Sequence, residues 1–420
     1  MDFKLHADNF FCFEVNNLNS KERKEIRYWK RAIKRVHNRI KIATECGYFD
    51  DVYSYSNLIM YGLKCCKNVG WKYSTQSYRV NLINNVNKLY NKIHSGNYTG
   101  DGFNEFDIIE RGKPRHIMSV TISERTAQKV SCDKVLVPTI SNCLIYDNGA
   151  SLEGKGISFA HKRLNRHLRK YYRENGNDGY VLTYDFSKFF DTAPHDYVKS
   201  ELNRRIIDSS VRDMIYTFID AFGDRGYGLG SQVSQISAIL VPNKIDHCIK
   251  EKLNIKYYAR YMDDGYLIHK SKQYLKECLD IIVSKCKSMG LVINPKKTKI
   301  LKLKEGFSFL KKRIRLTDKG KIIKKIEYKS VRSMKRKLKK FYYWNMYGKV
   351  LYSKKHKKKS KVKFSLFDIY TSYQSWRECA GISNNYWMIY KMDNYFYNLF
   401  YFHPLNKEKL MLIKESKSYV

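Results

Sequence analysis

The most informative stretch of this sequence is Ile255-Lys-Tyr-Tyr-Ala-Arg-Tyr-Met-Asp-Asp-Gly-Tyr-Leu-Ile-His269. Aromatic and β-branched residues flank an Asp-Asp-Gly sequence on both sides, which is the pattern of a β-hairpin with a tight turn. The adjacent carboxylates of Asp263 and Asp264 repel each other, and burying them is costly unless a cation is present. A solvated Asp-Gly turn is the simpler interpretation, so other segments of the chain must decide between the two.

The chain is strongly basic: its 420 residues include 80 Lys and Arg against 40 Asp and Glu, a formal net charge of +40. Such a charge predicts a polyanionic partner, and nucleic acid is the first candidate. No run approaches the roughly 18–20 apolar residues that span a bilayer, and the N-terminal residues show no secretory signal. The 10 cysteines show no zinc-ligand spacing. We therefore expect reduced thiols, a cytoplasmic location and no membrane partner.

A third carboxylate follows an apolar strand at Tyr180-Val-Leu-Thr-Tyr-Asp-Phe-Ser-Lys-Phe-Phe-Asp191. The strand ends at Asp185, and the chain then turns into a short helix. An isolated acid at such a position is most often a helix cap. Together with Asp263 and Asp264, however, it supplies the carboxylates that phosphoryl transfer through two Mg²⁺ ions, about 3.5–4 Å apart, requires around the metal pair.

The tetrapeptide Tyr261-Met-Asp-Asp264 resembles the catalytic motif of reverse transcriptases, and Asp185 with the aromatic residues after it resembles polymerase motif A. The resemblance implies template-directed DNA synthesis, in which dNTPs are added to a primer 3′ end. It further implies two Mg²⁺ ions, with Mn²⁺ as a substitute. The residues implied as metal ligands are Asp185, Phe186, Asp263 and Asp264.

The resemblance also implies a dNTP site. Phe190, five residues after Asp185, has the position of the aromatic steric gate that rejects a ribose 2′-hydroxyl; a core phenylalanine beside Phe189 is the alternative. The sequence Gly228-Leu-Gly-Ser-Gln-Val-Ser-Gln-Ile236 resembles motif B, where small residues let the backbone approach the nascent base pair. The other residues assigned to the dNTP are Lys113, Arg115, Gly230, Ser234 and Gln235, of which the first two are otherwise solvated surface charges.

Two later segments complete the polymerase order. Leu291-Val-Ile-Asn-Pro-Lys-Lys-Thr-Lys-Ile300 resembles motif D, which makes Lys297 the expected acid for the leaving pyrophosphate. Phe307-Ser-Phe-Leu310 resembles the motif E primer grip, with Lys311 in place of the usual glycine. The residues assigned to primer and template are Tyr261, Met262, Phe309, Leu310, Lys335 and Lys339.

Several segments carry less chemistry. Residues 19–43 predict a basic amphipathic helix with Ser20 as its N-cap, and residues 53–93 predict further helices. Glu124-Arg-Thr-Ala-Gln128 resembles an element of group II intron-like reverse transcriptases. His161 to Tyr172 predicts a basic helix that could follow a phosphate backbone.

The implied fold is α+β, a right-hand polymerase whose palm holds an antiparallel sheet packed on helices and whose fingers and thumb are mostly helical. Helices with interleaved tyrosine, tryptophan and lysine suit a template–primer groove, so we expect the thumb in the last part of the chain. The expected division is a helical N-terminal extension (1–104), fingers (105–179), palm (180–306) and thumb (307–420), with a basic loop at 353–363.

Within the group II intron-like reverse transcriptases, the Ser234-Gln235 form of motif B and the length of the chain are most similar to the stand-alone, unknown-group, defence-associated bacterial enzymes. That resemblance implies an RNA-directed DNA polymerase that copies an associated structured non-coding RNA into cDNA in antiphage defence. Retron or diversity-generating reverse transcriptases are the alternatives. A non-catalytic RNA-binding, maturase-like protein is a further one, although such a protein is expected to lose one of the three carboxylates.

Overall fold

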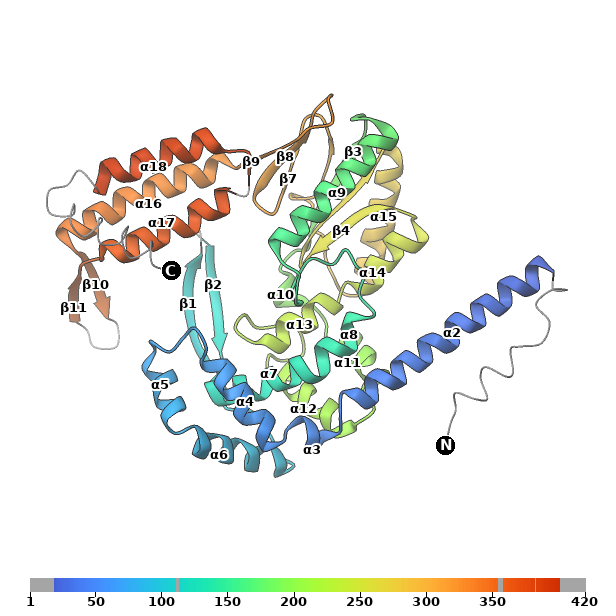
Figure 1. Ribbon diagram of the computed structural model, residues 1–420, viewed down its shortest axis with the longest axis horizontal. Coiled ribbons are helices and arrows are strands. Elements are labelled where there is room, and N and C mark those ends of the chain that lie inside the picture. The colour runs from blue at the N-terminus through green and yellow to red at the C-terminus, as the bar shows by residue number, and fades with distance from the viewer. Residues whose placement is uncertain (1–18, 111–112, 354–357, 382, 401–420) are drawn as a thin grey trace, which may run out of the picture. The chain divides into compact units, whose positions relative to one another are not determined.

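We describe a computed structural model of the chain over residues 19–110, 113–353, 358–381 and 383–400 (Figure 1). The chain divides into two compact units. The first unit runs as far as Gly156 and resumes over Phe186–Cys248 and Ile282–Val292. The second comprises Ile157–Asp185, Ile249–Ile281 and the described residues from Ile293 onward.

The first unit is mainly helical, and its first helix, α2 (Ser20–Glu45), begins with a capping box. The Asn19 side chain accepts hydrogen bonds from the backbone amides of Lys21 and Glu22, and the Glu22 carboxylate accepts one from the Asn19 amide. The prediction that Ser20 caps this helix was therefore wrong by one residue. An asparagine one position earlier satisfies the first amides equally well, so Ser20 becomes the first helical residue.

The predicted helices over residues 53–93 are confirmed, with the break near Gly70 and Trp71. Residues 104–110 and 113–119 form an antiparallel hairpin, in which Ile108 lies opposite Arg115. The elements of this unit after α2 are α3 (Phe49–Val52), α4 (Tyr55–Cys66), α5 (Tyr73–Val80), α6 (Leu82–His94), β1 (Asn104–Glu110), β2 (Lys113–Ser119), α7 (Ile122–Val130), the π-helical turn η2 (Ser131–Leu136), α8 (Val137–Ser141), α10 (Phe189–Thr192), α11 (Asp196–Asn203), α12 (Ser209–Asp220), α13 (Gln232–Leu240) and α14 (Asn243–His247).

The second unit contains the predicted antiparallel sheet, whose strands lie in the order β4-β5-β3-β6. In the hairpin, Tyr261 pairs with Asp264, so its loop consists of Met262 and Asp263. The sheet strands are β3 (Tyr180–Asp185), β4 (Tyr257–Tyr261), β5 (Asp264–His269) and β6 (Lys299–Lys302); the π-helical turn η3 (Cys248–Lys252) precedes β4, and α15 (Lys272–Ser288) follows β5.

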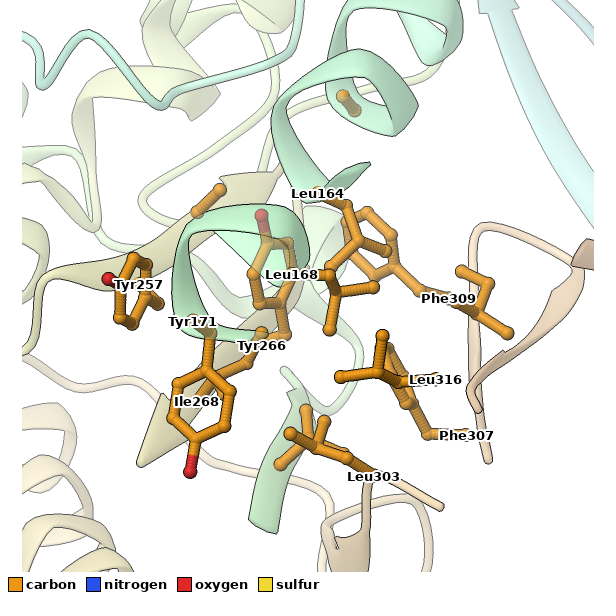
Figure 2. Packing of buried hydrophobic residues seen from close by; sticks show 14 residues of the cluster. Leu164, Leu168, Tyr171, Tyr257, Tyr266, Ile268, Leu303, Phe307, Phe309 and Leu316 are labelled. Carbon is orange, nitrogen blue, oxygen red and sulfur yellow. The ribbon is translucent and has the colours of Figure 1, made fainter. Parts of the chain in front are cut away.

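Helix α9 (Ile157–Asn175), predicted over 161–172, packs on this sheet through an apolar stripe. Leu164, Leu168 and Tyr171 recur every three to four residues and meet Tyr266 and Ile268 from strand β5 (Figure 2). A second, three-stranded sheet closes the same core with Phe307, Phe309, Ile314 and Leu316; its strands are β7 (Phe307–Phe309), β8 (Lys312–Leu316) and β9 (Ile322–Ile326).

The predicted thumb segment forms three helices that pack on one another, α16 (Tyr328–Tyr347), α17 (Leu366–Gly381) and α18 (Tyr386–Phe400) (Figure 1). Tyr373 is buried in their core, whereas Tyr386, the first residue of α18, is 74 % exposed. The basic segment 353–363 is not simply a loop. Its residues Lys358–Val362 form strand β11, which pairs with β10 (Lys349–Ser353).

No helix in the described part of the chain is long and apolar enough to cross a membrane.

Candidate active site

Two neighbouring strand ends bring the predicted carboxylates together. Asp185 is the last residue of β3 and Asp264 is the first residue of β5, and the antiparallel register places them directly opposite each other. Side chains that are opposite in such a pair lie on the same face of the sheet, about 4.5–5.5 Å apart at Cβ. Asp263 precedes Asp264 in the two-residue hairpin loop. We call these three residues the carboxylate cluster.

The hairpin is built differently from the predicted Asp-Gly turn. Gly265 is not in the turn but in strand β5, opposite Arg260. A Cβ at Gly265 would lie 2.4 Å from the ring of Tyr184, whose hydroxyl is 2.8 Å from that of Tyr258. The glycine is therefore required by the close approach of an aromatic ring, while Met262 in the loop adopts the positive φ of 53°.

A buried arginine supports this loop. Arg260 is 0 % exposed, and its guanidinium donates a hydrogen bond of 2.9 Å to the carbonyl oxygen of Met262. This contact fixes the backbone next to Asp263. Our reading of the sequence missed this role, although an arginine inside an otherwise apolar strand is a signal that could have found it, because such a charge is buried only with partners.

Lys297 forms an ion pair with the carboxylate cluster. The turn that carries it is attached to β3, since the Asn294 amide donates a 2.8 Å hydrogen bond to the carbonyl oxygen of Asp185. The Lys297 ammonium then lies 2.7 and 2.6 Å from the two carboxylate oxygens of Asp185. The Lys297 side chain is 51 % exposed and that of Asp185 only 8 %. The structure thus joins the motif D lysine to the motif A aspartate.

The cluster carries more negative charge than its lysine neutralises. Burial and the charges of Asp263 and Asp185 together raise the pKa of Asp264 to about 7, although Lys297 opposes this shift. A carboxyl group with this pKa shift gains from any additional cation nearby. Oxygen ligands of this kind are the ones that Mg²⁺ prefers.

The described residues contain no group of three or more His, Cys, Asp or Glu placed to hold one metal ion. In this arrangement the ammonium of Lys297 occupies both oxygens of Asp185. The chemistry of the cluster suits a divalent cation, but Asp185 would have to exchange its lysine for the ion. Phe186, also predicted as a ligand, has a ring that is 2 % exposed and stacks on Phe189 at 5.4 Å, which leaves only its backbone for this role.

In the first unit, Phe189 and Phe190 form an aromatic pair. Phe189 is 3 % exposed and packs into the core, whereas Phe190 is half-buried. The Tyr227 amide donates a 2.6 Å hydrogen bond to the Phe190 carbonyl oxygen, which holds the backbone there. Phe190 is thus held at the surface of its unit, and its role as a steric gate stays a prediction.

The motif B segment is attached to strand β2 by backbone contacts. The Met118 amide donates a 2.9 Å hydrogen bond to the Leu229 carbonyl oxygen. Gly230 has a φ of 129°, and a Cβ there would lie 2.5 Å from the Met118 carbonyl oxygen. No other residue fits without displacing the strand. Ser234 is fully buried in α13, and Gln235 beside it is exposed.

The Glu124–Gln128 element connects to motif B through side chains. The Ser231 hydroxyl caps α13 and donates a 2.9 Å hydrogen bond to Gln128, whose amide nitrogen donates to Glu124 at 3.1 Å. Glu124 also accepts a 2.8 Å bond from the Asp101 amide and is 2 % exposed. The element therefore holds the motif B segment in place, a role that our reading of the sequence did not assign.

The remaining predicted residues lie in three places. Arg115 is exposed on β2, and Lys113 is its first residue. Phe309 is 4 % exposed and packs edge-on against Tyr266 at 5.0 Å, so its ring belongs to the core of the second unit. The other residues assigned to primer and template are half-buried Tyr261 and Met262 in the catalytic hairpin, Leu310 in the β7–β8 turn, and Lys335 and Lys339, which are exposed on α16.

These strands, the paired carboxylates and the attached lysine define an α+β nucleotidyltransferase of the right-hand polymerase class. Residues 110–314 match the family described as Reverse transcriptase (RNA-dependent DNA polymerase). This part of the chain, which includes the carboxylate cluster and Lys297, is a reverse transcriptase domain, the domain of an RNA-directed DNA polymerase. No curated protein matches the sequence.

Among solved structures, the chain is similar to telomerases from two yeasts. It shares 14 % identity with telomerase from Candida albicans in complex with a TWJ fragment of telomeric RNA, with a TM-score of 0.41 over 58 % of this chain and 49 % of that one. It shares 15 % identity with a C-terminally truncated apo telomerase from Candida tropicalis, with a TM-score of 0.39 over 53 % and 54 %. The chain thus spans about half the length of these proteins.

Proposed function

We propose that this chain copies an RNA template into DNA by adding dNTPs to a primer 3′ end and releasing pyrophosphate. The observation that carries the proposal is the pairing of Asp185 with Asp264 on adjacent strand ends, with Asp263 beside them, inside a reverse transcriptase domain. Phosphoryl transfer needs little covalent chemistry from the protein, and positioned charges supply most of the catalysis.

The three carboxylates and Phe186 would hold two Mg²⁺ ions, with Mn²⁺ as a substitute. When bound, these ions supply activation of the primer hydroxyl and stabilisation of the charge on the triphosphate. Asp185 and Asp264 would hold the ions from opposite positions on two paired strands. Asp263 would do so from the hairpin loop that Arg260 supports. Lys297 would give its proton to the leaving pyrophosphate as general acid, and Asp185 would be one of the residues that hold the ions.

The proposed dNTP contacts lie in the first unit. Phe190 excludes the ribose 2′-hydroxyl. Gly230, Ser234 and Gln235 border the nascent base pair. Lys113 and Arg115 bind the triphosphate, for which two cations on a hairpin are suited. The primer and template contacts in the second unit are Tyr261, Met262, Phe309, Leu310, Lys335 and Lys339, with Phe309 acting by holding the β7–β8 turn rather than by touching the primer.

The biological role that we propose is antiphage defence, through cDNA copied from a structured non-coding RNA in the cytoplasm. The net charge of +40 and the reverse transcriptase domain support an RNA partner. A retron-like or diversity-generating role is the alternative.

Sequencing the nucleic acid that co-purifies from native cells tests this proposal, with Asp263→Ala as the catalytic control and Asp280→Asn, an exposed acid on α15, as the matched one. We expect one dominant structured RNA, with complementary DNA in the wild type and in Asp280→Asn but not in Asp263→Ala. Heterogeneous RNA without complementary DNA in any sample would contradict it and favour a non-catalytic RNA-binding protein.

A further inference from the structure

The outer face of α9 carries a row of cations. Lys162, Arg166, Arg169 and Arg173 recur every three to four residues, Lys170 lies beside Arg169, and all five are exposed. The apolar residues of the same helix point into the core (Figure 2), so the cations lie on the opposite face. None of these five side chains forms an ion pair with another described residue. Glu174, the one acid of α9, lies 3.8 Å from Lys256 instead.

This row borders two adjoining hollows in the surface of the second unit. One, of about 450 Å³, is lined entirely by α9 from Lys162 to Arg173. The other, of about 520 Å³, lies between α9, strand β9 with the turn before it, and residues Gly381, Ser383 and Asn384. Asn165 and Arg169 line both hollows, so the two adjoin at these residues, and we call them together the basic groove.

The walls of the basic groove are tied to each other. The turn before β9 is held on α9, because the Tyr172 hydroxyl donates a 2.7 Å hydrogen bond to the carbonyl oxygen of Asp318. On the other side, Lys324 and Asn384 exchange two hydrogen bonds, from the Asn384 amide to the Lys324 carbonyl oxygen at 2.9 Å and from the Lys324 amide to the Asn384 side chain at 3.1 Å. The groove is therefore a fixed feature of this unit.

The floor of the groove has an excess of buried positive charge. Lys324 lines it and is 9 % exposed, and Lys312, at a diagonal position on the neighbouring strand β8, is 2 % exposed. The Lys312 ammonium and both ring nitrogens of His161 have no hydrogen-bond partner among the described residues. Burial lowers the pKa of Lys324, and the charges of Lys312 and Arg169 lower it further. Cations crowded in this way gain from a bound anion.

We propose that the basic groove binds the phosphate backbone of a single nucleic-acid strand along α9, with one phosphate held between Arg169 and Lys324. An elongated row of cations suits a linear polyanion better than a single small phosphate. Because Ile322 is the one apolar side chain among the described residues lining the hollows, insertion into a membrane surface has little support. The inference rests on the proposed function, which makes RNA the expected source of the strand.

Fluorescence anisotropy with labelled RNA, measured across a series of salt concentrations, tests the groove. The variant Arg166→Gln/Arg169→Gln is compared with Lys272→Gln/Lys276→Gln, which removes the same charge from exposed positions of α15. Each lost phosphate contact lowers the salt slope of single-strand binding by about 0.7. We therefore expect the groove variant to lower the slope by about 1.4 and affinity at least about fivefold, and the control to change affinity by less than about twofold.

Single-stranded RNA, DNA of the same sequence and an RNA duplex distinguish the possible sources of the backbone. If the groove variant binds both single strands more weakly than the control does, the groove recognises the backbone alone. If its affinity falls for single-stranded RNA only, the groove also contacts the 2′-hydroxyl. Equal affinities and slopes for the groove and control variants on every probe would overturn the inference. Loss confined to the duplex would also overturn it.

A second variant, Lys324→Met, separates binding from structure. It removes a buried cation but keeps the aliphatic stem, so we expect equal or higher thermal stability together with weaker RNA binding. Lower stability with unchanged RNA binding would show a structural lysine and contradict the inference. Primer extension on a pre-annealed, saturating template–primer is measured in parallel, because failure of the proposed reaction would abolish extension in every variant while leaving this binding comparison intact.

Discussion

In the proposed reaction, Asp185 serves two partners in turn. In the structure its carboxylate binds the Lys297 ammonium through both oxygens. In the proposed reaction it binds a divalent ion. Lysine and metal therefore compete for the same oxygens, and the strength of the ion pair sets how easily the metal enters. Because Lys297 is 51 % exposed, the pair is screened by water and should contribute no more than about 1 kcal/mol to stability.

This competition predicts opposite effects of Lys297→Met on metal binding and on catalysis. Without the ammonium, the affinity of the apo-protein for Mn²⁺ should rise severalfold, measured by electron paramagnetic resonance of free Mn²⁺. The rate of dNTP addition should fall, because the general acid is gone. Lys296→Met, the exposed neighbour, is the matched control and should change neither quantity. Unchanged or weaker Mn²⁺ binding in Lys297→Met would show that the lysine does not compete with the metal.

Phe190 offers a test of sugar selection at one side chain. Phe190→Ala should admit NTPs, narrowing the preference for dNTPs by at least about tenfold, because a clash with the 2′-hydroxyl is removed. The ratio of kcat/KM for dCTP to kcat/KM for CTP on one template measures this preference. Phe189→Leu, a change in the core beside it, serves as control. A dNTP preference in Phe190→Ala equal to that of the wild type would refute the gate.

A substitution at Gly265 tests how the hairpin of β4 and β5 packs. Gly265→Ala should lower the free energy of unfolding by about 1–3 kcal/mol, because its Cβ would lie 2.4 Å from the Tyr184 ring. Chemical denaturation measures the loss. The double variant with Tyr184→Ala should show less than the sum of the two single losses, since the clash is then absent. Additive losses would mean that the two residues do not meet.

At the scale of elements, α9 joins two different surfaces. One face packs the palm sheet through Leu164, Leu168 and Tyr171, and the other carries the basic groove. His161 lies on the packed face, 1 % exposed, with its ring 6.1 Å from that of Phe309. Burial and, to a smaller extent, the charges of nearby Lys312 and Lys324 lower the pKa of His161 to about 4.

This shift predicts a dependence of stability on pH. Unfolding returns His161 to an ordinary pKa of about 6.5. The unfolded chain therefore binds a proton that the folded chain does not, and stability is lost as the pH falls from about 6.5 towards 4. His161→Phe should remove this loss. The free energy of unfolding of the variant minus that of the wild type should be about 2 kcal/mol larger at pH 5 than at pH 7.5, as measured by urea unfolding. Parallel pH profiles for the two proteins would contradict the neutral, buried histidine.

Across the whole molecule, the sequence predicted the elements that carry regular patterns. The antiparallel sheet, the strand that ends at Asp185, the hairpin that carries Asp263 and Asp264, and the helices over 53–93 and 161–172 are confirmed, because apolar periodicity and strand-end acids are local signals. The position of the hairpin turn was wrong, since Gly265 is required by the ring of Tyr184, which lies 81 residues earlier in the chain. A contact of that range has no local signal.

Other features also depended on partners far away in the sequence. The bond between Gln128 and Ser231 and the ion pair between Lys297 and Asp185 each join segments about a hundred residues apart. A charge run such as the basic segment near 358 predicts a solvated loop, yet pairing with β10 makes Lys358–Val362 a strand. Sequence patterns located the residues of the site, whereas tertiary contacts determined their neighbours.

Primer extension by the purified protein is the most direct test of the central claim. A labelled primer annealed to an RNA template is incubated with dNTPs and Mg²⁺, and the products of the wild type, Asp264→Asn and Asp280→Asn are compared. The account predicts full extension by the wild type and Asp280→Asn, and at least about a hundredfold slower extension by Asp264→Asn. Equal rates in all three proteins, or no extension by the wild type in Mg²⁺ or Mn²⁺, would contradict it.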